Sequence, residues 1–142
     1  MVDQKDLTIL EELENNARVS FTQIAQKLNV SEAAIRKRVK KLEENQVILG
    51  YKANVNYKKL GFSNKVLMGV DTTSKDYFKV LSKLKEFEII KNLTTSSGDH
   101  MIMFEVWIKN VDELTNLLEE INSIEGVIES CPSIIHENII KN

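Results

Sequence analysis

The second half of the chain contains one pattern twice. The apolar stretch KVLMGV begins at residue 65, and the similar stretch MIMFEV begins 36 residues later, at residue 101. Each is followed by a segment of helical periodicity, starting near Asp76 and Asp112, and then by a second strand-like run, at residues 89–95 and 127–135. A repeated strand-helix-strand unit predicts the order βαββαβ of a ferredoxin-like domain. The duplication therefore indicates an α+β fold for this half.

The two faces of the predicted sheet differ in their expected partners. The residues expected to form the core between sheet and helices are Val66, Met68, Val70, Ile102, Phe104 and Val106 on the strands, Phe78, Leu81 and Leu84 on the first helix, and Leu114, Leu117, Leu118 and Ile121 on the second. The opposite face carries Leu67, Met101, Met103 and Trp107, which is too apolar to remain in water. Both helices cover the same side in this topology, so we expect a second subunit to cover the other. Pro132, which lacks a backbone N–H, fits a last strand at the sheet edge.

The first third of the chain predicts three short helices. Asp3 can cap the first, which the pair Asn15 and Asn16 interrupts. The second, FTQIAQKL, breaks at Asn29, a residue type that tolerates the left-handed backbone of a sharp turn. Ser31 can then cap the third helix. The predicted buried faces are Leu7, Ile9, Leu10 and Leu13; Phe21, Ile24, Ala25 and Leu28; and Ile35, Val39 and Leu42.

The third predicted helix is strongly basic on its exposed side. Residues 31–42 include five basic residues and one acidic residue, although the whole chain has a net charge of −2. Ala33 and Ala34 keep the start of this helix narrow enough to enter a groove. Two helices around a tight turn, the second one basic, predict a helix-turn-helix that binds the major groove of double-stranded DNA. We expect the base edges to be faced by Ser31, Glu32, Ala33, Arg36 and Lys37, and the phosphates by Lys40 and Lys41.

These patterns divide the chain into three parts. Residues 1–50 are predicted to form a winged-type helix-turn-helix domain in which Val47 to Gly50 make a tight strand and turn, residues 51–62 a linker with an extended strand, and residues 63–142 the ferredoxin-like dimerisation domain. The chain has neither a run of the ~20 apolar residues that span a bilayer nor a signal sequence, so a cytoplasmic protein is expected. Its single cysteine, Cys131, is predicted to be a small buried residue, and no metal site or cofactor is expected.

Most of the chain resembles the Lrp/AsnC family, the leucine-responsive and asparagine-responsive regulators, and in particular its archaeal members. The likeness is carried by DQKDLTILEELENNARVSFTQIAQKLNVSEAAIRKRVKKLEENQVILGY, KLGF and SSGDHMIMFEVW. It implies a transcriptional regulator, not an enzyme, with a helix-turn-helix, a linker strand and a ferredoxin-like domain that dimerises through its sheet. It also implies homodimers that assemble further, to tetramers or octamers, and an amino acid bound between dimers.

The turn SSGDHM, residues 96–101, is where the resemblance places an effector. In the family this turn usually reads Gly-x-x-Asp, and its backbone groups and acid hold the amino acid. Here Gly98 matches, Asp99 and His100 intervene, and Met101 takes the position of the acid, which leaves a ligand ammonium group without that acceptor. Asp99 would take the place of that acid if the next strand extended back through the turn, because its side chain would then lie on the same face as that of Met101. The alternatives are a small-molecule site at these four residues, or a turn that only reverses the chain and contacts another dimer.

Two other functions remain open from the sequence. An enzyme of similar architecture, such as a tetrapyrrole-processing decarboxylase, could use Asp99, His100, His136 and Glu137, although no fixed-spacing catalytic motif joins them. An architectural protein would instead wrap DNA through phosphate contacts with little choice of sequence. A specific regulator differs from it in the ratio of specific to non-specific affinity, which would be ~10³ or more.

Overall fold

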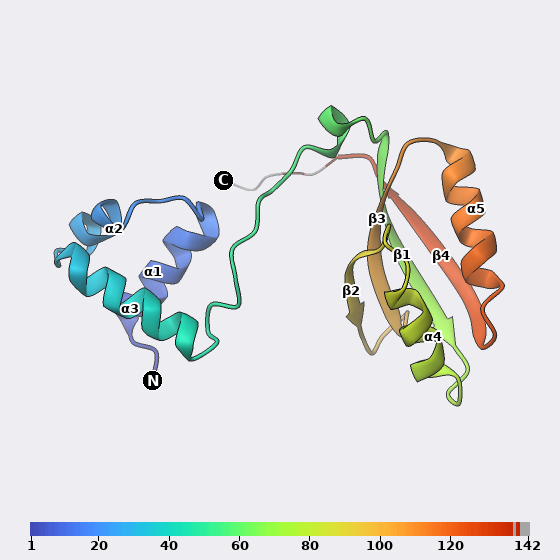
Figure 1. Ribbon diagram of the computed structural model, residues 1–142, viewed down its shortest axis with the longest axis horizontal. Helices are drawn as coiled ribbons and strands as arrows, with labels where there is room; N and C mark the ends of the chain where they lie inside the picture. Colours follow the sequence, from blue (N-terminus) through green and yellow to red (C-terminus); the bar gives the residue numbers. More distant parts are fainter. Residues whose placement is uncertain (138, 140–142) are drawn as a thin grey trace. The chain divides into compact units, whose positions relative to one another are not determined.

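The computed structural model describes residues 1–137 and residue 139. The chain divides into two compact units, residues 1–55 and the part from residue 56 onward. Figure 1 shows the three helices of the first unit, and a sheet with two α-helices in the second. The boundary between the units falls inside the predicted linker at residues 51–62. No helix among the described residues is long and apolar enough to cross a membrane.

Side-chain caps fix the start of each helix in the first unit. Its helices are α1 (Gln4–Asn15), α2 (Phe21–Leu28) and α3 (Glu32–Glu44). Asp3 caps α1 and Ser20 caps α2, each within a reciprocal capping box, and Ser31 caps α3 by accepting a hydrogen bond from a backbone N–H. The break between α2 and α3 lies at Asn29, whose φ is 50°. The predicted caps at Asp3 and Ser31 and the predicted turn at Asn29 are confirmed.

The three helices enclose a small apolar core. Its buried members all belong to the predicted faces, namely Ile9, Leu13, Ile24, Ala25, Ile35, Val39 and Leu42. The prediction for Leu7 is wrong, because this side chain is 49% exposed. α1 presents Ile9 and Leu13, four residues apart, to the core, and Leu7 lies away from that face.

The segment after α3 forms no strand, so the predicted wing is wrong. Gln46 adopts a left-handed φ of 55°, which turns the chain back onto α3. The backbone N–H groups of Val47 and Ile48 then donate to the carbonyl of Leu42, at 2.8 and 3.1 Å. These bonds satisfy the C-terminal end of the helix and leave the two N–H groups unavailable to a strand ladder. The described linker also lacks the expected strand, and its regular structure is a short 3₁₀ helix, Tyr57–Leu60.

The second unit is an antiparallel sheet with two helices. Its elements are β1 (Asn64–Thr72), α4 (Tyr77–Lys85), β2 (Lys91–Thr95), β3 (Ile102–Ile108), α5 (Val111–Asn122) and β4 (Val127–Ile135). The strand order β2-β3-β1-β4, with every pair antiparallel, is that of a βαββαβ unit, so the ferredoxin-like prediction is confirmed. Pro132 lies on β4, at the sheet edge, as predicted.

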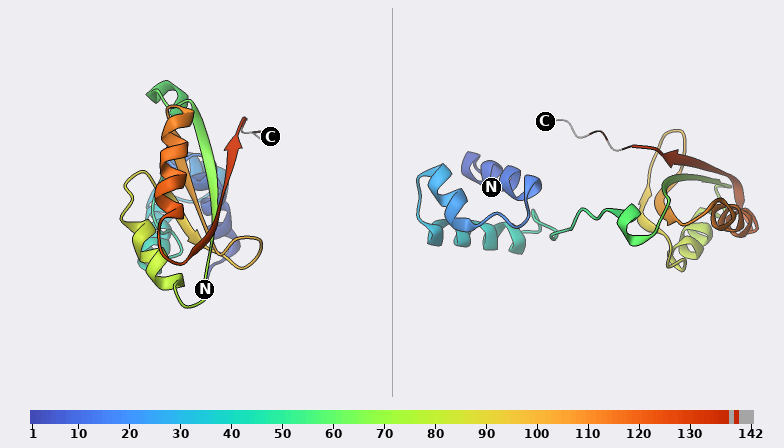
Figure 2. Two further views of the ribbon diagram at one scale, coloured as in Figure 1. Left: turned by 90° about the vertical axis from the view of Figure 1, so that its right-hand side faces the viewer. Right: turned by 90° about the horizontal axis from the view of Figure 1, so that it is seen from above.

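Alternation along the central strands gives the sheet one fully buried face. β1 and β3 pair so that Val66 lies opposite Val106 and Met68 opposite Phe104. These four side chains are at most 2% exposed. α4 and α5 both cover this face (Figure 2), to which they contribute Val80, Leu84, Leu114, Leu117 and Ile121. Neither α4 nor α5 covers the opposite face, which we call the open face; the short 3₁₀ helix lies at one end of it, where the ring of Tyr57 is 6.0 Å from that of Trp107.

The side chains of Phe78 and Met101 do not lie where the sequence predicts. Phe78 is 79% exposed, because α4 presents Val80 and Leu84, four residues apart, to the core. Met101 packs against the core instead of the open face, and its sulfur lies 3.9 Å from the hydroxyl of Thr72. β3 begins one residue after Met101, so strand alternation does not extend to it.

Candidate nucleic-acid interface

The exposed side of α3 carries all of the residues predicted to contact DNA. Ser31 precedes the helix as its cap, and the other residues follow on its solvent-facing turns. Each of the seven is exposed: Ser31, Glu32, Ala33, Arg36, Lys37, Lys40 and Lys41. The structure thus brings them together on one helix, and their contact with DNA remains a prediction.

On the flank beside α2, α3 carries a linked pair of charges. Nη2 of Arg36 lies 2.7 Å from Oε1 of Glu32, one helical turn earlier. The other carboxylate oxygen, Oε2, accepts a hydrogen bond of 2.8 Å from the hydroxyl of Thr22 on α2. The guanidinium carbon of Arg36 also lies 5.3 Å from the ring centroid of Phe21, within the range of a cation–π contact. Two residues of α2 therefore hold exposed charges of α3 in place.

These contacts favour the ionised form of Glu32. The hydrogen bond from the Thr22 hydroxyl is the main reason that the pKa of Glu32 lies below its ordinary value, and the hydrogen bond from Arg36 adds to the effect. Both donors stabilise the carboxylate relative to the carboxylic acid. At neutral pH the start of α3 therefore presents a negative charge directly beside Arg36.

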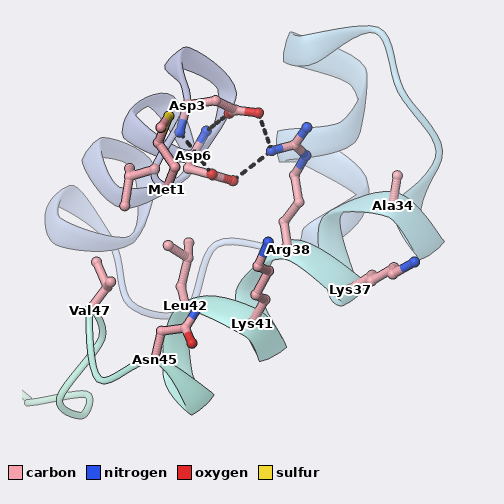
Figure 3. A pocket seen from close by; sticks show the side chains of 11 residues that line it. Met1, Asp3, Asp6, Ala34, Lys37, Arg38, Lys41, Leu42, Asn45 and Val47 are labelled. Carbon is pink, nitrogen blue, oxygen red and sulfur yellow. Dashed lines mark hydrogen bonds and ion pairs between the residues drawn. The ribbon is translucent and has the colours of Figure 1, made fainter.

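On the other flank, Arg38 turns toward the start of α1. Its Nη1 lies 2.7 Å from a carboxylate oxygen of Asp3 and 2.7 Å from one of Asp6. These two acids also form the capping box of α1, so one guanidinium ties the start of α1 to the middle of α3 (Figure 3). By composition Arg38 is one of five basic residues in this segment, but here its charge is neutralised.

A groove of about 600 Å³ lies between this flank of α3 and the start of α1. Figure 3 shows Lys37 and Lys41 along it, with Arg38 bent toward the two carboxylates. Within the described part of the chain, neither Lys37 nor Lys41 has an ion-pair partner. Lys40 does have one, because its Nζ lies 3.7 Å from Oε1 of Glu44. The ammonium groups of Lys37 and Lys41 are therefore available to a polyanion such as the DNA backbone.

Replacing Arg38 with methionine should loosen the contact between α1 and α3. Arg38→Met retains most of the aliphatic stem but leaves Asp6, whose side chain is only 11% exposed, without its cationic partner. Removing the partner of such a hydrogen-bonded charge costs about 1–3 kcal/mol. We expect faster amide hydrogen exchange in α1 and unchanged exchange in the sheet unit. The control is Lys5→Met, on the exposed surface of the same helix; equal exchange in the two variants would contradict the role of Arg38.

The predicted effector turn is a closed loop between β2 and β3. The backbone N–H of Ser96 donates to the carbonyl of Met101 at 2.9 Å, and the Ser96 hydroxyl donates to the carbonyl of His100 at 2.6 Å. Gly98 and Asp99 are exposed in the loop. Because β3 begins after this loop, the strand does not extend back to Asp99, and the condition for Asp99 to replace the missing acid is not met.

The acid that the fold brings to this turn is Asp71, at the end of β1. Its Oδ2 lies 2.7 Å from Nδ1 of His100, and its Oδ1 accepts a hydrogen bond of 3.0 Å from the backbone N–H of Met101. The hydrogen bond with His100 is the main reason that the pKa of Asp71 lies below its ordinary value. Sequence reasoning missed Asp71. The antiparallel pairing of β1 with β3 is the signal that could have found it, because this pairing places the end of β1 beside the start of β3.

Comparison with known proteins identifies the family. A family model described as the AsnC-type helix-turn-helix domain matches residues 2–43. The HTH-type transcriptional regulator LrpA of Pyrococcus horikoshii is 48% identical over 140 residues, which cover 98% of this chain and 99% of LrpA. This chain belongs to the Lrp/AsnC family of transcriptional regulators.

Two solved structures extend the comparison of this Lrp/AsnC protein to its fold. The structure of E. coli AsnC is similar with a TM-score of 0.83 at 28% identity, and the match covers 100% of this chain and 97% of AsnC. The feast or famine regulatory protein of M. tuberculosis, solved in complex with L-methionine, has a TM-score of 0.85 at 20% identity, with coverage of 100% and 97%. Both units of the chain therefore have counterparts in proteins of this fold.

The open face of the sheet in this Lrp/AsnC protein combines apolar and hydrogen-bonded side chains. Leu67 and Met103 are each 39% exposed. Trp107 donates its indole N–H to Glu105 at 2.6 Å, and strand alternation places Glu105, two residues earlier, on the same face. Cys131, on the same face, is only partly buried, so its predicted burial is wrong. Leu67 and Met103 thus leave apolar surface without cover from the described chain.

Proposed function

We propose that this regulator binds double-stranded DNA sequence-specifically as a dimer, with α3 of each subunit in the major groove. The observation that carries the proposal is the exposed side of α3, where basic side chains follow a narrow, alanine-bearing start. Two subunits would present two such helices to half-sites about one helical turn apart, or a multiple of that. The proposed function involves no catalysis, and we place the protein in the cytoplasm.

Position along α3 assigns the proposed contacts. The first turns of a recognition helix face base edges, and cations farther along meet phosphates. Arg36 is the strongest candidate for a base contact, because a guanidinium can donate two parallel hydrogen bonds to O6 and N7 of guanine. The proposed base-facing residues are Ser31, Glu32, Ala33, Arg36 and Lys37, and the proposed phosphate contacts are Lys40 and Lys41.

Arg36→Ala and Lys40→Ala should affect DNA binding differently. Arg36→Ala should relax the preference at one base pair and lower affinity for the preferred site by about 10- to 100-fold. Lys40→Ala should weaken all sequences alike and reduce the slope of log affinity against log salt by about one. Site selection from random duplex DNA, followed by titrations at several salt concentrations, measures both effects. Identical behaviour of the two variants would contradict the assignment of roles.

The same selection separates a specific regulator from an architectural protein. A consensus with two-fold related half-sites, bound ~10³-fold or more above random DNA at the same salt concentration, supports the proposal. DNA that is retained without a consensus, at a ratio near one, would favour wrapping through phosphate contacts and would contradict it.

We propose that the dimer forms through the open face of the sheet. The apolar side chains of Leu67 and Met103 on this face would otherwise remain in contact with water. A two-fold axis would bring the same surface of a partner against them, since such an interface pairs one patch with its own copy. Assembly into tetramers or octamers, which the family resemblance implies, is part of the same proposal.

A second proposed site takes an amino acid at the turn formed by Gly98, Asp99, His100 and Met101. The closed loop, with the Asp71 carboxylate beside it, supports the proposal, and the M. tuberculosis protein of the same fold was solved with L-methionine. Because Met101 offers no carboxylate, a ligand ammonium group would share Asp71 with His100. Each of the twenty amino acids can be added to DNA titrations and to sedimentation runs. If no amino acid changes the affinity for DNA or the sedimentation of the protein, the turn only reverses the direction of the chain.

A further inference from the structure

Thr22 lies outside the set of residues expected to touch DNA, yet hydrogen bonds join it to that set. It is on the first turn of α2, and its side chain is exposed. Its hydroxyl donates to Oε2 of Glu32 at 2.8 Å, and Oε1 of Glu32 accepts from Arg36 at 2.7 Å. The three side chains form a chain of hydrogen bonds from α2 to the exposed guanidinium group of α3.

This chain restricts side chains that would otherwise move freely. The Arg36 side chain is 66% exposed and that of Glu32 is 46% exposed, and an exposed ion pair of this kind contributes little order by itself. The Thr22 hydroxyl fixes the carboxylate from the other side, and the Phe21 ring lies 5.3 Å from the guanidinium carbon. Restricting Arg36 before it meets DNA reduces the rotamer entropy that binding would remove.

The same contacts favour a base over a phosphate as the partner of Arg36. The Glu32 carboxylate neutralises the guanidinium group and repels phosphate oxygens, so Arg36 gains little from non-specific backbone contact. One N–H of Nη2 is engaged by Glu32, and within the described residues no other acceptor takes a hydrogen bond from this guanidinium group, so its remaining donors can reach a base edge. Guanine offers two uncharged acceptors, O6 and N7, to such donors.

We infer that Thr22 is a positioning residue that sets the base preference of Arg36 by holding Glu32 against it. The inference rests on the proposed function, in which α3 contacts base edges. Without the Thr22 hydroxyl, Glu32 has one partner instead of two, and neither Glu32 nor Arg36 is held in a single position. Arg36 then reaches either a base or a nearby phosphate, and discrimination at its base pair falls.

Thr22→Val tests this inference with little change in side-chain shape. Binding sites are first selected from random duplex DNA with the wild-type protein, and the base pair at which Arg36→Ala loses its preference is located. The affinity of Thr22→Val is then measured for the selected site and for its three substitutions at that base pair, at one salt concentration. We expect discrimination there to fall by about tenfold, the size of one charge-assisted hydrogen bond, with discrimination elsewhere unchanged.

Matched variants separate positioning from a loss of structure. Thr22→Ser retains a hydroxyl and should restore wild-type discrimination. Thr8→Val makes the same change on α1, where the hydroxyl donates to the backbone carbonyl of Gln4, and should leave every base preference unchanged. In the Arg36→Ala background, Thr22→Val should cause no further loss, because the side chain that it positions is absent.

Two results would overturn the inference. Wild-type discrimination in Thr22→Val, or an equal loss of affinity for every duplex, would show that Thr22 does not act through Arg36. A wild-type protein that selects no consensus would overturn the proposed function itself, before any Thr22 variant is compared. The two failures are therefore distinguishable, because a failure confined to the Thr22 variants leaves the contact of α3 with base edges intact.

Discussion

Ala33→Glu is expected to lower the affinity for a specific DNA site by about 100-fold or more while leaving the fold intact. Ala33 is exposed on the first turn of α3, in the narrow part of the helix that we expect to enter the major groove. A glutamate there brings bulk and a negative charge toward base edges and phosphates. A dimer carries the substitution twice, so both half-sites lose contacts.

The substitution should not weaken the helix. Glutamate is a good helix former, and a negative charge in the first turn interacts favourably with the helix dipole. The native helix already has Glu32 in this turn, and Ser31 supplies the cap. A loss of DNA binding would therefore report on the interface and not on unfolding, which circular dichroism of the purified variant can verify.

Ala17→Glu is the matched control for this prediction. Ala17 is exposed in the loop between α1 and α2, so the variant carries the same added charge on the same unit but away from α3. Titrations against the selected duplex at one salt concentration should give an affinity close to the wild-type value. Equal affinities of the Ala33 and Ala17 variants would show that α3 is not the element in the groove.

Local signals in the sequence predict the helical unit well. Asp3 and Ser31 mark the starts of two helices because their side chains accept a hydrogen bond from the backbone N–H three residues later. Asn29 marks the turn because asparagine tolerates a positive φ. Each signal acts within a few residues of the chain, so it needs no knowledge of tertiary structure. The repeated strand-helix-strand pattern is recognised over 36 residues, but it too needs no knowledge of tertiary contacts, and it predicts the topology of the second unit.

Contacts between distant segments are what the sequence does not reveal. In the sequence Arg38 is one more cation of a basic helix, but its partners are 35 and 32 residues away. Thr22 likewise lies ten residues from Glu32, on another helix. Charge composition cannot separate a paired cation from an unpaired one, because the pairing depends on how α1 and α2 pack against α3. The positive charge available to DNA is therefore smaller than composition indicates.

The errors at Phe78 and Met101 have a different cause: the sequence does not fix, to one residue, which face of the helix is buried or where the strand begins. Helical spacing near Asp76 allows either Phe78 or Val80 on the buried face, and the observed packing uses Val80. Strand alternation likewise assigns Met101 to a face only if the strand includes it, and β3 starts one residue later. A shift of one residue reverses the face of a strand residue.

Leu67→Asp is expected to convert the proposed dimer into monomers. Leu67 lies on the open face and is 39% exposed in the single chain. A two-fold interface would bury this position twice, so the variant would place two unpaired carboxylates in apolar surroundings. We expect the dissociation constant of the dimer to rise ~10³-fold or more, which sedimentation velocity over a range of protein concentrations measures.

Phe78→Asp is the control for charge and for loss of an apolar side chain. Phe78 is 79% exposed on α4, which covers the other side of the sheet, so this variant should sediment as the wild-type dimer or a larger assembly. Trp107 gives a second measurement, because it is the single tryptophan of the chain and lies on the open face. The fluorescence emission of Trp107 should shift to longer wavelength in Leu67→Asp, where the open face meets water, and should not shift in Phe78→Asp.

The effect of Leu67→Asp on DNA binding connects the sheet unit to the recognition helix. A dimer binds both half-sites of a palindrome at once, whereas a monomer binds each half-site independently. Leu67→Asp should therefore lose affinity for the full site and retain wild-type affinity for a single half-site, although α3 is unchanged. A monomeric variant that still bound the full site like the wild-type protein would show that dimerisation does not determine operator affinity. A variant that remained dimeric would place the dimer interface on another surface.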